Sequence, residues 1–175
     1  MKTKTIFLDR DGVINHEVGY LHRVEDFKFI EGIFETCLYF ISLGFEIIVI
    51  TNQSGLARNY YGEHEFHKVN NWMLNEFKLK GVEILDVFYC PHSPEERCDC
   101  RKPKPGMLLQ AKKKYNIDMS RSWMIGDKED DISAAISAGI NQTILVRSGH
   151  KIDADNTNSA YIIDSIQSAK SVVKD

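Results

Sequence analysis

Two carboxylates, two positions apart, follow the first apolar segment of the chain. Asp9 and Asp11 come directly after residues 5–8, which are β-branched, aromatic and apolar. Alternate side chains of a strand share a face, so the pair could converge on one cation or one reacting group, with Arg10 pointing elsewhere. Like charges this close need a metal ion, a shared proton or a nearby cation. An acidic turn is the alternative, because Asp and Gly are common turn residues.

Small polar residues follow the second apolar segment, residues 46–50. They run from Thr51 through Asn52, Gln53 and Ser54 to a glycine. Their hydroxyl and backbone N–H groups could donate hydrogen bonds to an anion. A simple turn is the alternative, since Asn, Ser and Gly favour turns.

A cysteine–histidine cluster follows the third apolar segment. Cys90, His92, Cys98 and Cys100 lie within eleven residues and include three of the chain's four cysteines. Three thiolates and one imidazole supply the four ligands of a closed tetrahedral zinc site. Closed coordination leaves no open position, so this zinc is expected to be structural. A disulfide with one spare thiol is the alternative.

A basic segment begins directly after this cluster. Arg101, Lys102 and Lys104 lie within four residues that also contain a proline, and a second proline follows. Cations held by a stiff backbone could face a phosphate group. A solvated basic loop is the alternative, and charge alone does not separate Lys102 from Lys104.

A further carboxylate follows the fourth apolar segment, residues 123–125. Asp127 stands near the start of an acidic run that ends at Asp131. Helix N-capping and the helix dipole explain acids in the first turn of a helix over 132–138. They explain Asp127 less well, because it comes almost directly after the strand.

Apolar strands and amphipathic helices alternate along the chain. The expected strands are 5–8, 46–50, 85–89, 123–125, 143–146 and a short 160–163, and the expected helices are 32–43, 63–80, 107–115, 132–138 and 164–173. This alternation predicts an α/β fold with a doubly wound, mainly parallel sheet and helices on both faces. The carboxyl ends of parallel strands meet at one edge, so the polar motifs should gather there. Carboxylates for a divalent cation beside donors for an anion suit phosphoryl transfer.

Length and composition agree with one such domain over 1–175. The net charge of −3 gives no global basic field for nucleic acid. The sequence has neither an apolar run long enough to span a membrane nor a signal-peptide pattern, so we expect a cytoplasmic protein. No uncapped apolar stripe stands out, so we expect a monomer. Thiols stay reduced in the cytoplasm, which favours metal over disulfide. The sequence has no insertion between its motifs that is long enough for a large cap domain. Residues 13–30 and the zinc loop are therefore expected to shape the substrate site.

The motifs resemble those of a known family. Asp9-x-Asp11-Gly12, Thr51-Asn52-Gln53, the lysine segment and Gly126-Asp127-x-x-x-Asp131 occur in the order of the four motifs of the haloacid dehalogenase superfamily of phosphatases. The cysteine–histidine loop and the run from Cys100 to Gly106 resemble the D-glycero-D-manno-heptose 1,7-bisphosphate phosphatases and the histidinol-phosphate phosphatases. The stretches 51–58 and 104–107 look closer to the heptose enzymes.

The resemblance implies roles for the site residues. Asp9 would be the nucleophile, and Asp11 would be the general acid and base. Mg²⁺ would bind the Asp9 carboxylate, the Asp11 backbone carbonyl and Asp127. Thr51 and Lys102 would hold the phosphoryl oxygens, and Lys102 is preferred over Lys104 on the resemblance alone.

The resemblance also implies a substrate and a pocket. Arg101 would recognise the substrate, and the pocket would further contain Glu17, Val18, Gly19, Tyr20, Asn52, Gln53, Ser54 and Lys128. The implied reaction is Mg²⁺-dependent removal of the 7-phosphate of a heptose 1,7-bisphosphate, in ADP-heptose or related nucleotide-heptose biosynthesis for lipopolysaccharide or another glycan. The sequence leaves the preferred anomer open. The alternatives are a histidinol-phosphate phosphatase and a non-catalytic zinc-loop binding module.

Overall fold

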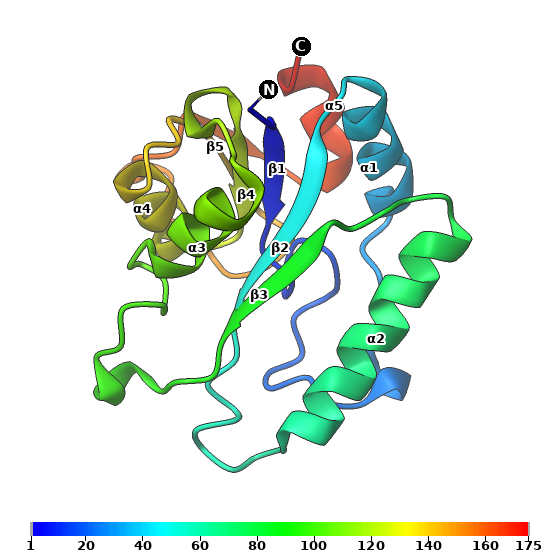
Figure 1. The fold of residues 1–175 in the computed structure, drawn as a ribbon, viewed down its shortest axis with the longest axis vertical. Coiled ribbons are helices and arrows are strands. Elements are labelled where there is room, and N and C mark those ends of the chain that lie inside the picture. Colours follow the sequence, from blue (N-terminus) through cyan, green and yellow to red (C-terminus); the bar gives the residue numbers. More distant parts are fainter. Residues whose placement is uncertain (1, 175) are drawn as a thin grey trace.

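A computed structural model describes residues 2–174. Its sheet is entirely parallel in the strand order β3-β2-β1-β4-β5-β6 (Figure 1). The strands are β1 (Thr5–Leu8), β2 (Glu46–Asn52), β3 (Asp86–Cys90), β4 (Trp123–Gly126), β5 (Gln142–Val146) and β6 (Tyr161–Ile163). All the expected strands are present, which confirms the parallel α/β architecture.

Helices cover both faces of this sheet. One face carries α1 (Ile33–Ser42), α2 (Glu63–Leu79) and α5 (Ala169–Val172), and the other carries α3 (Gly106–Tyr115) and α4 (Glu129–Ser137) (Figure 1). The doubly wound, Rossmann-like fold expected from the sequence is therefore confirmed. Cys37 is buried on the inner face of α1 and does not belong to the cysteine–histidine cluster.

The core has two layers that share the central strands. In β1, Ile6 and Leu8 pack with the helices of one face, whereas Phe7 packs with those of the other. All three side chains are fully buried. A strand buried on both faces reads as a continuous apolar run, which is why its position could be predicted.

Two helices differ from the expected ones by more than one residue at a boundary. Helix α4 begins at Glu129 because the Asp131 side chain accepts the backbone N–H of Lys128 at 3.1 Å and so caps an earlier turn. The expected last helix over 164–173 is instead a 3-10 turn at Ile166–Ser168 followed by the single turn of α5. The strand β2 also continues through Thr51 and Asn52, which places both side chains on the sheet itself.

The carboxyl ends of the strands lie together at the lower edge of the sheet in Figure 1. Residues 13–30 and 91–105 connect elements at this same edge, and no part of residues 2–174 forms a separate cap domain. No described helix is both long and apolar enough to cross a membrane. Both connections contribute residues to the cavity at this edge.

Candidate active site

The central strand β1 lies where the sheet order changes direction. Strand β2 pairs with it on one side and β4 on the other. The Asp9 backbone N–H donates to the Ile125 carbonyl at 3.0 Å, so the pairing continues just past the end of β1. Open α/β sheets bind ligands at such a point, outside the carboxyl ends of the strands. Asp9, Thr51 and Asp127 meet there.

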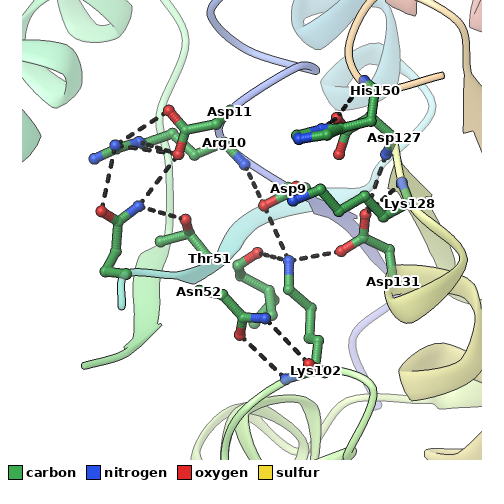
Figure 2. A network of polar contacts seen from close by, with 12 residues as sticks. Asp9, Arg10, Asp11, Thr51, Asn52, Lys102, Asp127, Lys128, Asp131 and His150 are labelled. Atoms are coloured by element: carbon green, nitrogen blue, oxygen red, sulfur yellow. Dashed lines mark hydrogen bonds and ion pairs between the residues drawn. The ribbon is translucent and has the colours of Figure 1, made fainter. Parts of the chain in front are cut away.

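Three buried carboxylates gather at this point, and one lysine pairs with two of them (Figure 2). Ligand oxygens of Asp9, Asp127 and Asp131 lie within 4.8 Å of one another. The Lys102 ammonium donates to Asp9 Oδ1 at 2.9 Å and to Asp131 Oδ1 at 2.7 Å. It also donates to the Ile50 carbonyl at 2.7 Å. One cation against three carboxylates leaves this group net negative.

Burial and the neighbouring charges shift the pKa of two members of this group. Burial, together with the neighbouring Asp131 and Asp127, raises the pKa of Asp9 well above its usual range, against the lowering effect of Lys102. Burial opposes the charge of Lys102, yet Asp131 and Asp9 raise the pKa of its ammonium. Oδ1 of Asp127 is buried and accepts no hydrogen bond from the described residues. Surplus negative charge and an unused carboxylate oxygen fit a divalent cation.

The Asp11 carboxylate lies outside this group of three. It accepts from Arg10 Nε and Nη2 at 3.2 Å each, from Asn15 Nδ2 at 3.0 Å and from Gln53 Nε2 at 3.2 Å. Burial acts to raise the pKa of Asp11, but the Arg10 charge and these hydrogen bonds lower it. We expected the Asp9 and Asp11 side chains to converge on one cation or one reacting group, and Arg10 to point elsewhere. For a cation, this is wrong for Asp11, whose carboxylate is not in the group of three. It is also wrong for Arg10, which points to the Asp11 carboxylate. The difference arises because the buried guanidinium pairs with the adjacent carboxylate.

Every hydrogen-bonding position of the Gln53 amide is used. Its Nε2 donates to Thr51 Oγ1 at 2.8 Å as well as to Asp11. Its Oε1 accepts from the Tyr61 hydroxyl at 2.6 Å and from Arg10 Nη2 at 3.5 Å. Donors on one side and acceptors on the other fix the amide orientation. Sequence reasoning missed Arg10 and Tyr61 as parts of this site.

The structure separates the two lysines that charge could not. The Asn52 side chain donates to the Lys102 carbonyl and accepts from the Lys102 N–H, both at 3.1 Å. This two-point contact fixes the backbone of Lys102, whose side chain is only 3% exposed. Lys104 instead points to solvent, where it pairs with Asp99 at 3.2 Å.

These positions predict unequal effects of replacing the two lysines. Lys102→Gln is expected to lower kcat by about 10²–10³-fold, the usual cost of losing one donor that stabilises transition-state charge. Lys104→Gln should change kcat by less than about threefold, because an exposed ion pair contributes little. Phosphate release by the two purified variants measures this. A similar loss in both variants would contradict the assignment.

A cavity of about 340 Å³ opens over the strand edge. The expected site residues that line it are Asp11, Glu17, Gly19, Tyr20, Asn52, Gln53, Ser54, Arg101 and Lys128. Val18 does not line it: its side chain is 52% exposed and lies over a separate hollow on the outer side of residues 18–28. This corrects the expected place of Val18. The backbone turns there through Gly19 and Tyr20, which both have positive φ.

The cavity also has lining residues that the sequence did not indicate. Arg58, Tyr61, Asp130 and His150 are among them. Arg58 lies in the stretch 51–58 that carried the family resemblance, so a signal for it existed. His150 lies in the loop after β5, outside every motif, and no spacing pattern pointed to it.

The cysteine–histidine cluster comes together as expected. Ligand atoms of Cys90, His92, Cys98 and Cys100 lie within 4.8 Å of one another, and the sulfur–sulfur distances run from 3.1 to 3.5 Å. These distances exceed a disulfide bond of about 2.05 Å, and the cysteines are free. Nδ1 of His92 faces Cys100 Sγ at 3.3 Å. The donor set and its spacing fit one tetrahedral metal ion such as zinc.

This cluster positions the basic segment beside it. Cys100 directly precedes Arg101, whose Nη1 donates to the His92 carbonyl at 3.3 Å. Lys102 follows and enters the carboxylate group. A metal ion bound to the cluster would thus hold the Arg101 and Lys102 side chains in place.

Comparison with known proteins identifies the family. A family model described as HAD-hydrolase-like matches residues 99–169. The D-glycero-alpha-D-manno-heptose-1,7-bisphosphate 7-phosphatase of Photorhabdus laumondii subsp. laumondii is 47% identical over 165 residues, which cover 90% of each chain. The chain belongs to the heptose bisphosphate phosphatases of the haloacid dehalogenase superfamily.

Other members of this phosphatase family match equally widely. The D-glycero-beta-D-manno-heptose-1,7-bisphosphate 7-phosphatase of Vibrio cholerae is 45% identical over 175 residues, covering 95% of this chain and 94% of that protein. A crystal structure of D,D-heptose 1.7-bisphosphate phosphatase from B. bronchiseptica, complexed with magnesium and phosphate, has a TM-score of 0.85, with 26% identity and 97% of both chains covered. The chain is thus a phosphoric monoester hydrolase, as expected. Relatives named for the alpha anomer are 47% and 48% identical to this chain, and a relative named for the beta anomer is 45% identical.

Proposed function

We propose that this chain removes the 7-phosphate of D-glycero-D-manno-heptose 1,7-bisphosphate through an aspartyl-phosphate on Asp9. The observation that carries the proposal is the buried Asp9 carboxylate, 2.9 Å from Lys102 and beside Asp127 and Asp131. A carboxylate nucleophile needs cations to approach an anionic phosphate, and this group supplies one and has ligands for another. The family of the chain supports the choice of substrate.

The reaction would proceed in two steps. Asp9 attacks phosphorus as the bond to the sugar oxygen breaks, and Asp11 donates a proton to that oxygen. Asp11 then takes a proton from water, which attacks the aspartyl-phosphate and releases phosphate and free Asp9. The donors from Arg10, Asn15 and Gln53 favour the ionised form of Asp11, which accepts the proton of water in the second step; the first step requires the protonated form, which the same donors disfavour.

The remaining residues would hold the phosphoryl group and the metal ions. Lys102 and the Thr51 hydroxyl bind phosphoryl oxygens; the hydroxyl accepts from Gln53 and so keeps its own hydrogen for donation. The Asp9 and Asp127 carboxylates and the Asp11 carbonyl would hold Mg²⁺, which offsets phosphoryl charge when bound. The cysteine–histidine cluster would hold Zn²⁺ with a structural role.

The cavity is of a size and charge suited to a small sugar that carries two phosphate groups. Arg58, Arg101 and Lys128 stand along its wall, where they can bind the phosphate that is not cleaved. We place the reaction in the cytoplasm, where thiolates that bind a metal stay reduced, and propose that the enzyme acts as a monomer.

Phosphate release with Mg²⁺ from the α and β heptose 1,7-bisphosphates and from histidinol phosphate tests this function. A large preference for either bisphosphate supports the proposal and names the anomer. Preference for histidinol phosphate would overturn the substrate assignment. No turnover of any of the three, with both metals bound, would favour a binding module instead.

The pH dependence of magnesium binding should follow the raised pKa of Asp9. Its proton must leave before a cation binds, so the apparent dissociation constant for Mg²⁺ is expected to rise as the pH falls toward that pKa. Titration calorimetry between pH 8 and about pH 5 measures this. An Asp9→Asn variant provides the control, since its weaker binding should depend less on pH. A constant that does not change with pH in the wild type would contradict the prediction.

A further inference from the structure

His150 makes two contacts with the same oxygen of Asp127. Its ring Nδ1 lies 2.6 Å from Asp127 Oδ2, and its backbone N–H donates to that oxygen at 2.9 Å (Figure 2). Asp127 follows β4, whereas His150 lies in the loop between β5 and β6. A carboxylate at the centre of the site is thus held from a loop that contains none of the motif residues.

The loop is itself fixed against the first motif. The Ser148 hydroxyl donates to the Gly12 carbonyl at 2.8 Å. A Cβ atom on either Gly12 or Gly149 would overlap the Asp127 carboxylate. Residues 148–150 therefore pack directly against the Asp127 carboxylate, and Gly12 needs its positive φ of 90° as well.

The two contacts with His150 leave the two oxygens of the Asp127 carboxylate in different states. Oδ2 is occupied by two donors, whereas Oδ1 is fully buried and has no partner among the described residues. Asp127 also offers a ligand oxygen to the group that contains Asp9 and Asp131. We propose that His150 is a positioning residue that fixes the Asp127 carboxylate, so that Oδ1 is presented as a magnesium ligand.

This inference rests on the proposed magnesium site and adds a residue to it. A side-chain donor that fixes a ligating group typically changes metal affinity by about 10–100-fold. The physical reason is that a carboxylate already held in one orientation loses less freedom when the cation binds. The imidazole can donate from Nδ1 in its neutral or its charged form, so the role does not depend on its charge.

A substrate contact is the competing role, because the His150 ring also lines the cavity. Binding of Mg²⁺ measured without substrate separates the two roles. A substrate contact alters KM for the sugar phosphate and leaves the metal affinity alone. A positioning residue alters the metal affinity before any substrate is present.

The test compares three variants of the full chain by titration calorimetry with Mg²⁺ alone. His150→Ala keeps the backbone N–H and should weaken Mg²⁺ binding about tenfold. His150→Asn places an amide N–H near the position of Nδ1 and should restore affinity to within about threefold of the wild type. His64→Ala, at an exposed position on α2, is the matched control and should leave the affinity unchanged.

Three results would overturn the proposal. One is unchanged Mg²⁺ affinity in His150→Ala with a raised KM for the sugar phosphate. Another is an equal loss of affinity in His150→Ala and His150→Asn, which would show that the amide donor does not replace the ring. The third is a wild type that does not bind Mg²⁺ at all. A wrong substrate assignment alone would leave the Mg²⁺ titrations unchanged, so the two failures can be told apart.

Discussion

An Asp9→Asn variant is expected to lose at least about 10⁴-fold in kcat while remaining folded. The amide cannot form the aspartyl-phosphate. Without metal, the variant should also be more heat-stable than the wild type, by a few degrees. The raised pKa of Asp9 means that its ionised form is disfavoured in the folded protein. Such a group favours folding below its unfolded-state pKa and loses that contribution as the pH rises through its folded pKa, so a neutral amide is better accommodated at pH 7.

Phosphate release and melting in the presence of a chelator measure the two effects. A gain of about 1 kcal/mol corresponds to about 2–4 °C for a chain of this size. Asp164→Asn is the control, because that carboxylate is exposed and should change neither quantity. Residual turnover above one per cent would contradict a covalent role for Asp9, and a lower melting temperature would contradict the electrostatic reading of the site.

Loss of the metal from the cysteine–histidine cluster should reduce both stability and activity. A Cys100→Ser variant is expected to lose its zinc and more than about 4 kcal/mol of the free energy of unfolding, since loss of a metal site is among the largest single effects. Activity should fall at least about 100-fold, because Arg101 and Lys102 follow Cys100 directly. Residues 91–105 contain little regular structure that could hold them otherwise.

Elemental analysis gives the readout that separates this effect from simple damage to the core. The wild type should contain about one zinc per chain, as a single cluster of four ligands requires. The matched control is Cys37→Ala, which removes a buried thiol outside the cluster and should keep its zinc. Full activity in a zinc-free Cys100→Ser variant would contradict the structural role of the cluster.

The fold could be predicted because burial leaves a pattern in the sequence. Strands buried on both faces, such as β1 and β2, read as uninterrupted apolar runs. The end of the chain was less predictable: α5 is a single turn, and its position depends on packing against α1 rather than on local propensity. Similarly, β2 reaches Asn52 because pairing with β3 continues there, which turn-forming residues alone do not reveal.

The cysteine–histidine cluster was predictable from its spacing, Lys102 from the family resemblance, and three further residues from their places directly after strands. Asp9, Thr51 and Asp127 were found in this way. The Lys102 ion pair with Asp131, the Tyr61 contact to Gln53 and the His150 contact to Asp127 all depend on tertiary structure. Sequence spacing carries no record of such contacts, because each joins segments that only the completed fold brings together.

The central position of β1 determines how late during synthesis the sheet of this enzyme can be completed. The first strand to emerge has β4, more than 100 residues later, as one of its two neighbours. The closure over Asp127 waits longer still, for Gly149 and His150. A nascent chain that has released all four motifs is therefore still expected to be inactive. Catalytic competence should arrive with the last quarter of the chain, and recovered activity would report complete folding rather than the formation of any one segment.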